Sequence, residues 1–120
     1  MSTSRFTVLF TDYFYNWLNA QPLAIQEDVY AALNNLEQFG HLLSRPYADT
    51  LKGSKFAKMK ELRIQSGGKP IRAFFAFDPL RQAIVLCAGD KSGDKRFYEK
   101  MIAIADREFA AYLANLEYSK

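Results

Sequence analysis

Basic side chains gather in one short stretch of this 120-residue chain. Between positions 52 and 72 there are seven basic residues and a single acidic one, Glu61, which gives this stretch a net charge of +6. Such a density of positive charge suits a polyanion, because every phosphate that is neutralised releases condensed counterions. A solvated loop that keeps a small protein soluble is the alternative interpretation. The basic residues are Lys52, Lys55, Lys58, Lys60, Arg63, Lys69 and Arg72.

The rest of the composition narrows the possible chemistry. The chain as a whole has a net charge of +3, because residues 1–51 carry −3 and residues 73–120 are neutral. A single cysteine, Cys87, and a single histidine, His41, exclude an intrachain disulfide and the usual Cys/His zinc site. We therefore expect no metal and no cofactor, a buried Cys87, and a site built from Lys and Arg side chains.

The sequence contains no feature that predicts contact with a membrane. No apolar run approaches the roughly 20 residues that span a bilayer, and the first 14 residues lack the layout of a signal peptide. Together with the lone cysteine, these features predict a cytoplasmic protein. The length predicts a single domain over residues 1–120, with one core.

Hydrophobic periodicity predicts the elements that position the cations. The order is β-α-α-β-β-β-α, which indicates an α+β fold: a small antiparallel sheet with an N-terminal helical hairpin and a long C-terminal helix. Thr11 and Gly40 are suited to cap the two hairpin helices. Strands are expected at 6–10, 59–64, 71–77 and 83–88, helices at 12–19, 22–39 and 94–116, and a loop at 41–58.

The expected strand register makes the arginines neighbours. If Ile64 lies opposite Ile71, then Arg63 faces Arg72, and like charges in this position need a carboxylate or a bound anion between them. Glu61 on the same face is one candidate, and a phosphate held by both guanidinium groups is the other. The same register places Phe77 opposite Ala83, Phe75 opposite Val85, Phe74 opposite Leu86 and Ala88 opposite Arg72, with Cys87 on the same core face as Leu62.

Four segments together resemble a known family. They are residues 45–53 (RPYADTLKG), 59–63 (MKELR), 71–79 (IRAFFAFDP) and 88–98 (AGDKSGDKRFY). In this order and at these spacings they resemble the HigB-like, phage-derived branch of the RelE/ParE toxin superfamily. The resemblance implies the toxin of a type II toxin–antitoxin module, neutralised by a helix-turn-helix antitoxin. It also implies entry into the ribosome and cleavage of mRNA, as in most RelE-like and HigB-like proteins.

The resemblance also assigns roles to residues. Metal-independent RNA cleavage needs a base for the 2′-hydroxyl, cations for the phosphorane and an acid for the leaving oxygen. The family pattern falls on Lys60, Arg63 and Arg72, with the arginines as phosphate stabilisers and Lys58 or Lys60 as the base. Further contacts with RNA are expected from Lys52, Lys55, Lys91, Lys95, Arg96 and Tyr98. For Tyr98 the alternative is a structural role, as the first buried residue of the apolar stripe of the last helix.

Two other functions stay open at this point. Several relatives carry catalytic His or Tyr residues in a C-terminal tail, whereas here a helix is expected in that region. A non-enzymatic gyrase inhibitor of the ParE type, or a phage-derived interaction module without toxicity, would need no catalytic residues. His41 follows Gly40 and lies far along the chain from the basic cluster, so we interpret it as a helix cap or an exposed side chain rather than as a catalytic group.

Overall fold

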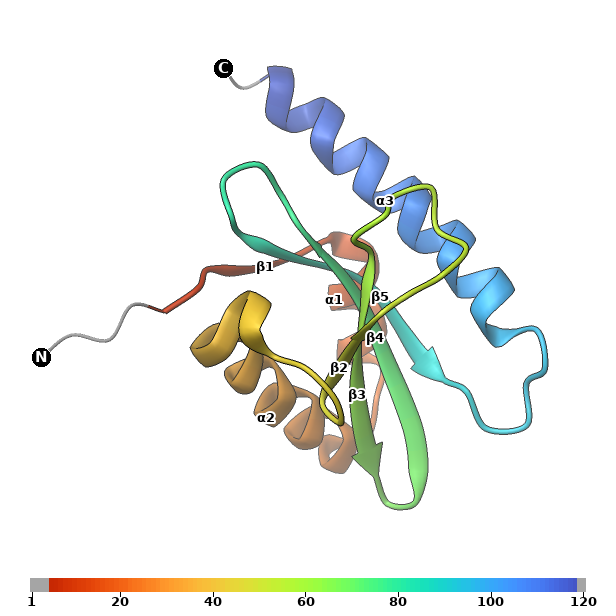
Figure 1. Ribbon diagram of the computed structural model, residues 1–120. Helices are drawn as coiled ribbons and strands as arrows, with labels where there is room; N and C mark the ends of the chain where they lie inside the picture. Colours follow the sequence, from red (N-terminus) through yellow and green to blue (C-terminus); the bar gives the residue numbers. More distant parts are fainter. Residues whose placement is uncertain (1–4, 119–120) are drawn as a thin grey trace, which may run out of the picture.

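The computed structural model describes residues 5–118 and has helices on both faces of a five-stranded sheet (Figure 1). Helices α1 and α2 cover one face, and α3 crosses the other. The elements are β1 (Val8–Phe10), α1 (Asp12–Asn19), α2 (Leu23–Phe39), a 3-10 turn (Gly40–Leu42), β2 (Ala48–Thr50), β3 (Lys60–Ser66), β4 (Lys69–Phe77), β5 (Ala83–Asp90) and α3 (Phe97–Tyr118). The predicted α+β class is confirmed, and so is the predicted order of elements apart from one additional short strand, β2.

The sheet differs from the prediction at both edges. Its strand order is β1-β5-β4-β3-β2, and β1 pairs with β5 in parallel, so the sheet is mixed and not wholly antiparallel. At the other edge β2 pairs with β3, inside the region expected to be a loop. A three-residue strand has no readable alternation, so β2 cannot be recognised from local sequence, and the parallel pairing of β1 depends on a partner elsewhere in the chain.

Helix α1 begins and helix α2 ends at the predicted capping residues. Thr11 Oγ1 accepts a hydrogen bond from Phe14 N at 3.2 Å, and Gly40 follows α2 with φ of 56°, so both predicted caps are confirmed. Helix α3 begins at Phe97 rather than at the expected Asp94. The carboxylate of Asp94 instead accepts a hydrogen bond from Arg96 N at 3.0 Å, because a short acidic side chain competes for backbone donors ahead of a helix.

The central register is confirmed as far as a β-bulge. Ile64 pairs with Ile71, and Arg63 therefore faces Arg72. Phe77 pairs with Ala83 and Phe75 with Val85, also as expected. The register then shifts, so that Phe74 pairs with Cys87 instead of Leu86, and Gly89 rather than Ala88 lies opposite Arg72. A bulge adds one residue to one strand and breaks the alternation of faces, which local sequence did not reveal.

The sheet divides the apolar interior into two clusters instead of the single core expected. One lies under α1 and α2 and includes Phe14, Leu36 and Phe75. The other lies under α3 and includes Phe74, Leu86 and Cys87. Cys87 is buried as predicted, but on the α3 face, because the bulge moves it there. Burial raises the pKa of its thiol to about 12.

Two absences concern the described residues only. Over residues 5–118 no helix is long and apolar enough to cross a membrane. In the same range, no three His, Cys, Asp or Glu side chains lie close enough together to hold a metal ion.

Candidate active site

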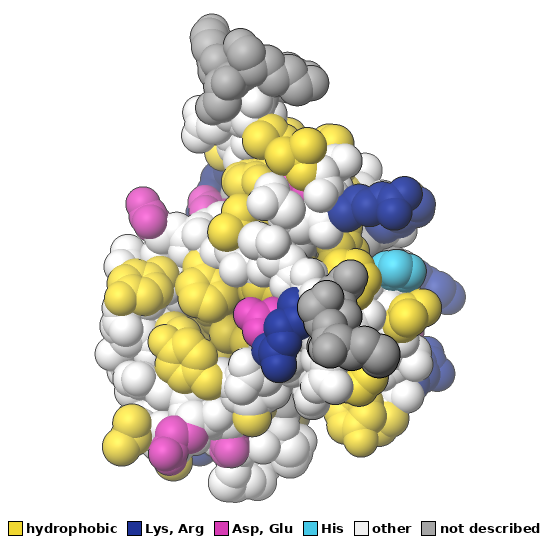
Figure 2. Space-filling view, turned by 90° about the vertical axis from the view of Figure 1, so that its left-hand side faces the viewer, with side chains coloured by type: hydrophobic (Ala, Val, Ile, Leu, Met, Phe, Trp, Pro, Cys, Tyr) yellow, Lys and Arg dark blue, Asp and Glu magenta, His cyan; other side chains and the backbone are white. Residues whose placement is uncertain are grey.

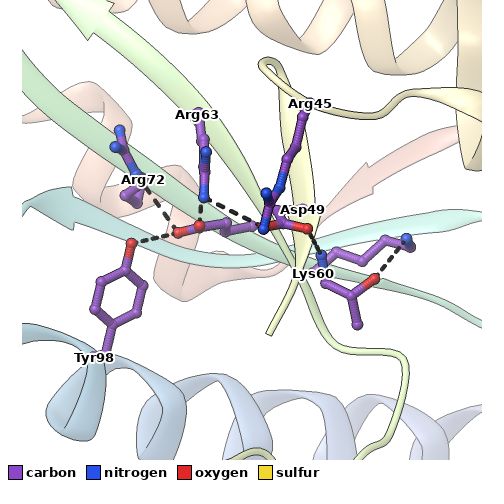
Figure 3. Close-up of polar contacts among 8 residues, drawn as sticks. Arg45, Asp49, Lys60, Arg63, Arg72 and Tyr98 are labelled. Atoms are coloured by element: carbon purple, nitrogen blue, oxygen red, sulfur yellow. Dashed lines mark hydrogen bonds and ion pairs between the residues drawn. The ribbon is translucent and has the colours of Figure 1, made fainter. Parts of the chain in front are cut away.

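A buried carboxylate stands at the centre of the polar contacts on the α3 face of the sheet. Glu61 is only 3% exposed. Its Oε1 accepts a hydrogen bond from the Tyr98 hydroxyl at 2.7 Å, and its Oε2 accepts one from Arg63 Nε at 3.1 Å. Arg72 Nε lies 3.6 Å from Oε1 and completes an ion pair (Figure 3). Two cations and one phenol thus converge on a single carboxylate.

The fold brings these groups together from three elements. Glu61 and Arg63 are two residues apart on β3, so strand alternation points both side chains to the same face. Arg72 on β4 lies directly opposite Arg63. Tyr98 is the second residue of α3, and Gly89 allows this helix to begin close to the sheet. A Cβ at Gly89 would lie 3.1 Å from a ring carbon of Phe97.

The network continues outward to the edge strand β2. Arg63 Nη2 donates to Asp49 Oδ2 at 3.3 Å, and Arg45 Nη2 lies 2.8 Å from the same oxygen. The hydrogen bond from Arg45 holds the pKa of Asp49 below its ordinary value, with a contribution from the charge of Arg63. Asp49 and Arg45 were not expected at the site, because they lie in the segment that was interpreted as a loop.

Both arginines keep N–H donors that the described residues leave unused. Arg72 Nε is buried and has no hydrogen-bond partner among the described residues, and Nη1 donates to its neighbour's carbonyl, Ile71 O, at 3.1 Å. Glu61 is therefore the carboxylate that balances the facing arginines, which is one of the two arrangements expected from sequence. Its hydrogen bonds use few of the ten N–H donors that two guanidinium groups carry.

Tyr98 is held as a neutral phenol at the entrance to this network. Burial and the hydrogen bond to Glu61 raise the pKa of Tyr98 above its ordinary value. Lys91 Nζ lies 5.5 Å from the centre of the Tyr98 ring, in a cation–π contact. Of the candidates beyond the last strand, the structure thus brings Tyr98 to Glu61 and Lys91 to the ring of Tyr98.

The other sequence candidates lie elsewhere. Lys58 and Lys60 line a cleft on the α1/α2 face, across the sheet from Arg63 and Arg72. Lys52 and Lys55 belong to a loop that crosses α3 (Figure 1). The carboxylate of Asp106 on α3 accepts a hydrogen bond from Lys55 N at 2.9 Å and so holds the loop in place. Lys95 is exposed, and Arg96 is exposed and paired with Glu99 at 3.2 Å. The basic residues of the +6 stretch thus lie on several separate surfaces, and Lys69 lies apart from all of these at the β3–β4 turn.

Glu61 is the residue that sequence reasoning undervalued. The sequence pattern indicates it as a charge partner for the arginines and not as a reacting group. The signal was present, since a carboxylate alternates with an arginine on one strand face. Its burial and its contact with Tyr98, 37 positions away, appear only in the folded chain.

Comparisons with known proteins agree with the resemblance seen in the sequence. The model of the family of phage-derived Gp49-like proteins matches residues 16–110. HigB2 of Mycobacterium tuberculosis, named as a candidate toxin, is 45% identical over 106 residues, which cover 87% of this chain and 53% of HigB2. The chain thus spans about half the length of that relative. HigB3 of the same organism, also named as a candidate toxin, is 44% identical over 82% of this chain and 86% of its own.

A solved structure supports the fold. The toxin–antitoxin complex RelBE2 of Mycobacterium tuberculosis contains a chain that matches with a TM-score of 0.55 over 72% of this chain and 98% of its own. The two sequences are 19% identical, so this likeness concerns the fold alone. The chain therefore belongs to the Gp49-like family of phage-derived proteins, is homologous to HigB2 and HigB3, and has a fold like that of a chain in the RelBE2 complex.

Proposed function

We propose that this protein is the toxin of a type II toxin–antitoxin system and that it is a ribosome-dependent, metal-independent mRNA endonuclease. The family and the HigB relatives support the toxin assignment. One observation carries the enzymatic part: a buried carboxylate hydrogen-bonded to both a phenol and an arginine, with a second arginine 3.6 Å away. These are the groups that cleavage of an RNA phosphodiester needs.

Glu61 is the general base in this proposal. Its carboxylate takes the proton of the 2′-hydroxyl, and the 2′-oxygen then attacks the adjacent phosphorus. Lys58 and Lys60, which the sequence suggests for this role, line a cleft whose described lining includes neither of the two facing arginines, and this supports Glu61 instead. Glu61 therefore replaces them as the proposed proton acceptor.

Arg63 and Arg72 stabilise the phosphorane, and Tyr98 supplies the proton for the leaving group. The unused guanidinium donors face the developing negative charge on the phosphoryl oxygens. As the bond from phosphorus to the 5′-oxygen breaks, the Tyr98 phenol protonates that oxygen. The products are a 2′,3′-cyclic phosphate and a 5′-hydroxyl. The 2.7 Å hydrogen bond then lets Glu61 return its acquired proton to Tyr98.

The partners follow from the same proposal. The protein acts in the cytoplasm on mRNA in the ribosome, and a cognate helix-turn-helix antitoxin neutralises it. The fold neighbour comes from a toxin–antitoxin complex, which supports an antitoxin partner.

A reconstituted translation reaction followed by primer extension on the message tests the activity. The wild-type chain should give discrete cleavage within translated codons. Glu61→Gln and Tyr98→Phe should lower the cleavage rate at least about 100-fold, the usual loss when a general acid or base is removed. Lys69→Gln, which removes an exposed charge at the β3–β4 turn, is the control and should cleave at the wild-type rate.

Two results would refute the nuclease proposal. Intact mRNA together with an SOS response in cells that express the wild-type chain would favour a gyrase inhibitor of the ParE type. Growth without any defect would favour a non-toxic interaction module. Cleavage by Glu61→Gln at the wild-type rate would refute the role of Glu61 while leaving the nuclease assignment intact.

A further inference from the structure

A cleft of about 370 Å³ lies across the sheet from Glu61. We call it the basic cleft. Three lysine and arginine side chains and the only imidazole of the chain surround it, and no acidic side chain is among its described lining residues. Figure 2 shows the histidine at the edge of one face, with lysine and arginine side chains above and below it. The lining residues are Phe6, His41, Lys58, Lys60, Phe77 and Arg81.

The cations of the basic cleft are free of carboxylates. Lys60 Nζ donates to Thr50 Oγ1 at 3.1 Å, and within residues 5–118 no ion pair joins Lys58, Lys60 or Arg81 to an acidic side chain. Arg63, by contrast, is paired with two acidic residues. The field of the basic cleft is therefore not cancelled locally, which favours an anion as its ligand.

The cleft also has an aromatic floor. The Phe6 ring lies edge-on to the His41 ring, with centroids 5.4 Å apart, and edge-on to Phe77 at 6.4 Å. Gly40 makes this arrangement possible, because a Cβ there would lie 2.3 Å from two carbons of the Phe6 ring. Partly exposed aromatic rings beside unpaired cations are the pattern that binds single-stranded nucleic acid, since bases stack on the rings and phosphates contact the cations.

A second hollow connects the basic cleft with the Glu61 network. This hollow, of about 350 Å³, shares His41 and Lys60 with the cleft and is also lined by Arg45 and Asp49. Asp49 is in turn ion-paired with Arg63. Basic side chains therefore follow one another around the β2 edge, from the cleft to the site proposed for cleavage.

We propose that the basic cleft binds a nucleotide of single-stranded RNA that flanks the nucleotide held at Glu61. The phosphate lies among Lys58, Lys60 and Arg81, and the base stacks on Phe6. The strand runs around the β2 edge to the cleavage site. This inference rests on the proposed function, and it gives two of the catalytic candidates from sequence a binding role instead.

The affinity of the basic cleft for RNA can be measured with a labelled single strand in which every 2′-oxygen is methylated. This RNA has no 2′-hydroxyl to attack the phosphorus and is therefore not cleaved. Fluorescence anisotropy over a range of salt gives the affinity and its salt slope. For a single strand, each phosphate contact contributes about 0.7 to the slope of log affinity against log salt concentration. The loss of one contact therefore lowers the affinity about fivefold at 0.1 M salt. Lys58→Gln and Arg81→Gln should each lose about this amount. Lys69→Gln removes the same charge outside both hollows and should stay within about twofold of wild type.

A 2-aminopurine base in the same RNA reports stacking. Its fluorescence should be quenched on binding to the wild-type chain, and less so with Phe6→Leu. Unfolding midpoints of all variants, measured in urea, separate loss of binding from loss of fold. Equal effects of Lys58→Gln and Lys69→Gln would overturn the inference. So would displacement of the RNA by polyglutamate without any quenching in the wild-type complex, which would identify an acidic polypeptide as the ligand.

The two proposals fail separately. If the wild-type chain does not cut mRNA but binds the methylated RNA through the cleft, the cleavage proposal fails and the binding site stands. If the wild-type chain cuts mRNA while Lys58→Gln and Arg81→Gln bind as well as Lys69→Gln, only the basic cleft is refuted.

Discussion

The ion pair between Glu61 and Arg72 should stabilise the fold as well as form part of the candidate active site. The side chains are 4% and 13% exposed, and the charged atoms are 3.6 Å apart. At an effective dielectric constant of about 20, two unit charges at this separation attract by about 4–5 kcal/mol. Removal of one partner leaves the other charge buried, which costs about 3–5 kcal/mol. Glu61→Gln and Arg72→Met should each destabilise the chain by that amount.

A double-mutant cycle separates the pair from its surroundings. The double variant removes both charges, so its loss should be smaller than the sum of the single losses by about 3 kcal/mol. Urea unfolding, followed by far-ultraviolet circular dichroism and by the fluorescence of Trp17, measures all four free energies. Equal slopes against urea concentration are needed for the comparison.

Arg63→Met is the matched control within the same network. The Arg63 side chain is 33% exposed and shares Glu61 with Arg72, so its removal should cost only about 1 kcal/mol. A coupling energy below about 0.5 kcal/mol between Glu61 and Arg72 would refute the reasoning. In that case the carboxylate would be held by Tyr98 and Arg63 alone.

Three further predictions concern stability and reactivity. Gly40→Ala should lower the free energy of unfolding by at least about 3 kcal/mol, because it combines backbone strain with a clash against Phe6. The control Gly67→Ala, at a φ of 55° with no atom within 4 Å, should lower it by only about 1 kcal/mol. Equal losses of the two variants in urea unfolding would contradict the clash. Cys87 is fully buried and its thiol pKa is about 12, so a thiol reagent at pH 8 should label it only after unfolding. Burial alone would raise the pKa of Asp78, but hydrogen bonds from the backbone N–H of residue 82 and from other donors lower it. The stability that this carboxylate adds should therefore be complete above about pH 4 and should fall as the pH drops further. Asp78→Asn should remove that part of the pH dependence of the free energy of unfolding.

Local signals in the sequence determined the elements of this fold and one important contact. Caps at Thr11 and Gly40 fixed the helical hairpin, and alternation of apolar residues fixed three strands. Pairing Ile64 with Ile71 was enough to place Arg63 opposite Arg72, because register in a half-buried sheet follows from which residues are apolar. The concentration of positive charge between positions 52 and 72 was also visible directly.

Only the tertiary structure decided how those charges are used. Alternation sends Lys60 and Glu61 to opposite faces of β3, and long-range packing then determines that one face meets Tyr98 while the other meets His41 and Phe6. The short strand β2, the parallel pairing of β1 and the bulge beside Phe74 depend on partners distant in the chain, so no local pattern encodes them. Burial of Glu61 arises in the same way, because the residues that shield a side chain from water come from separate elements.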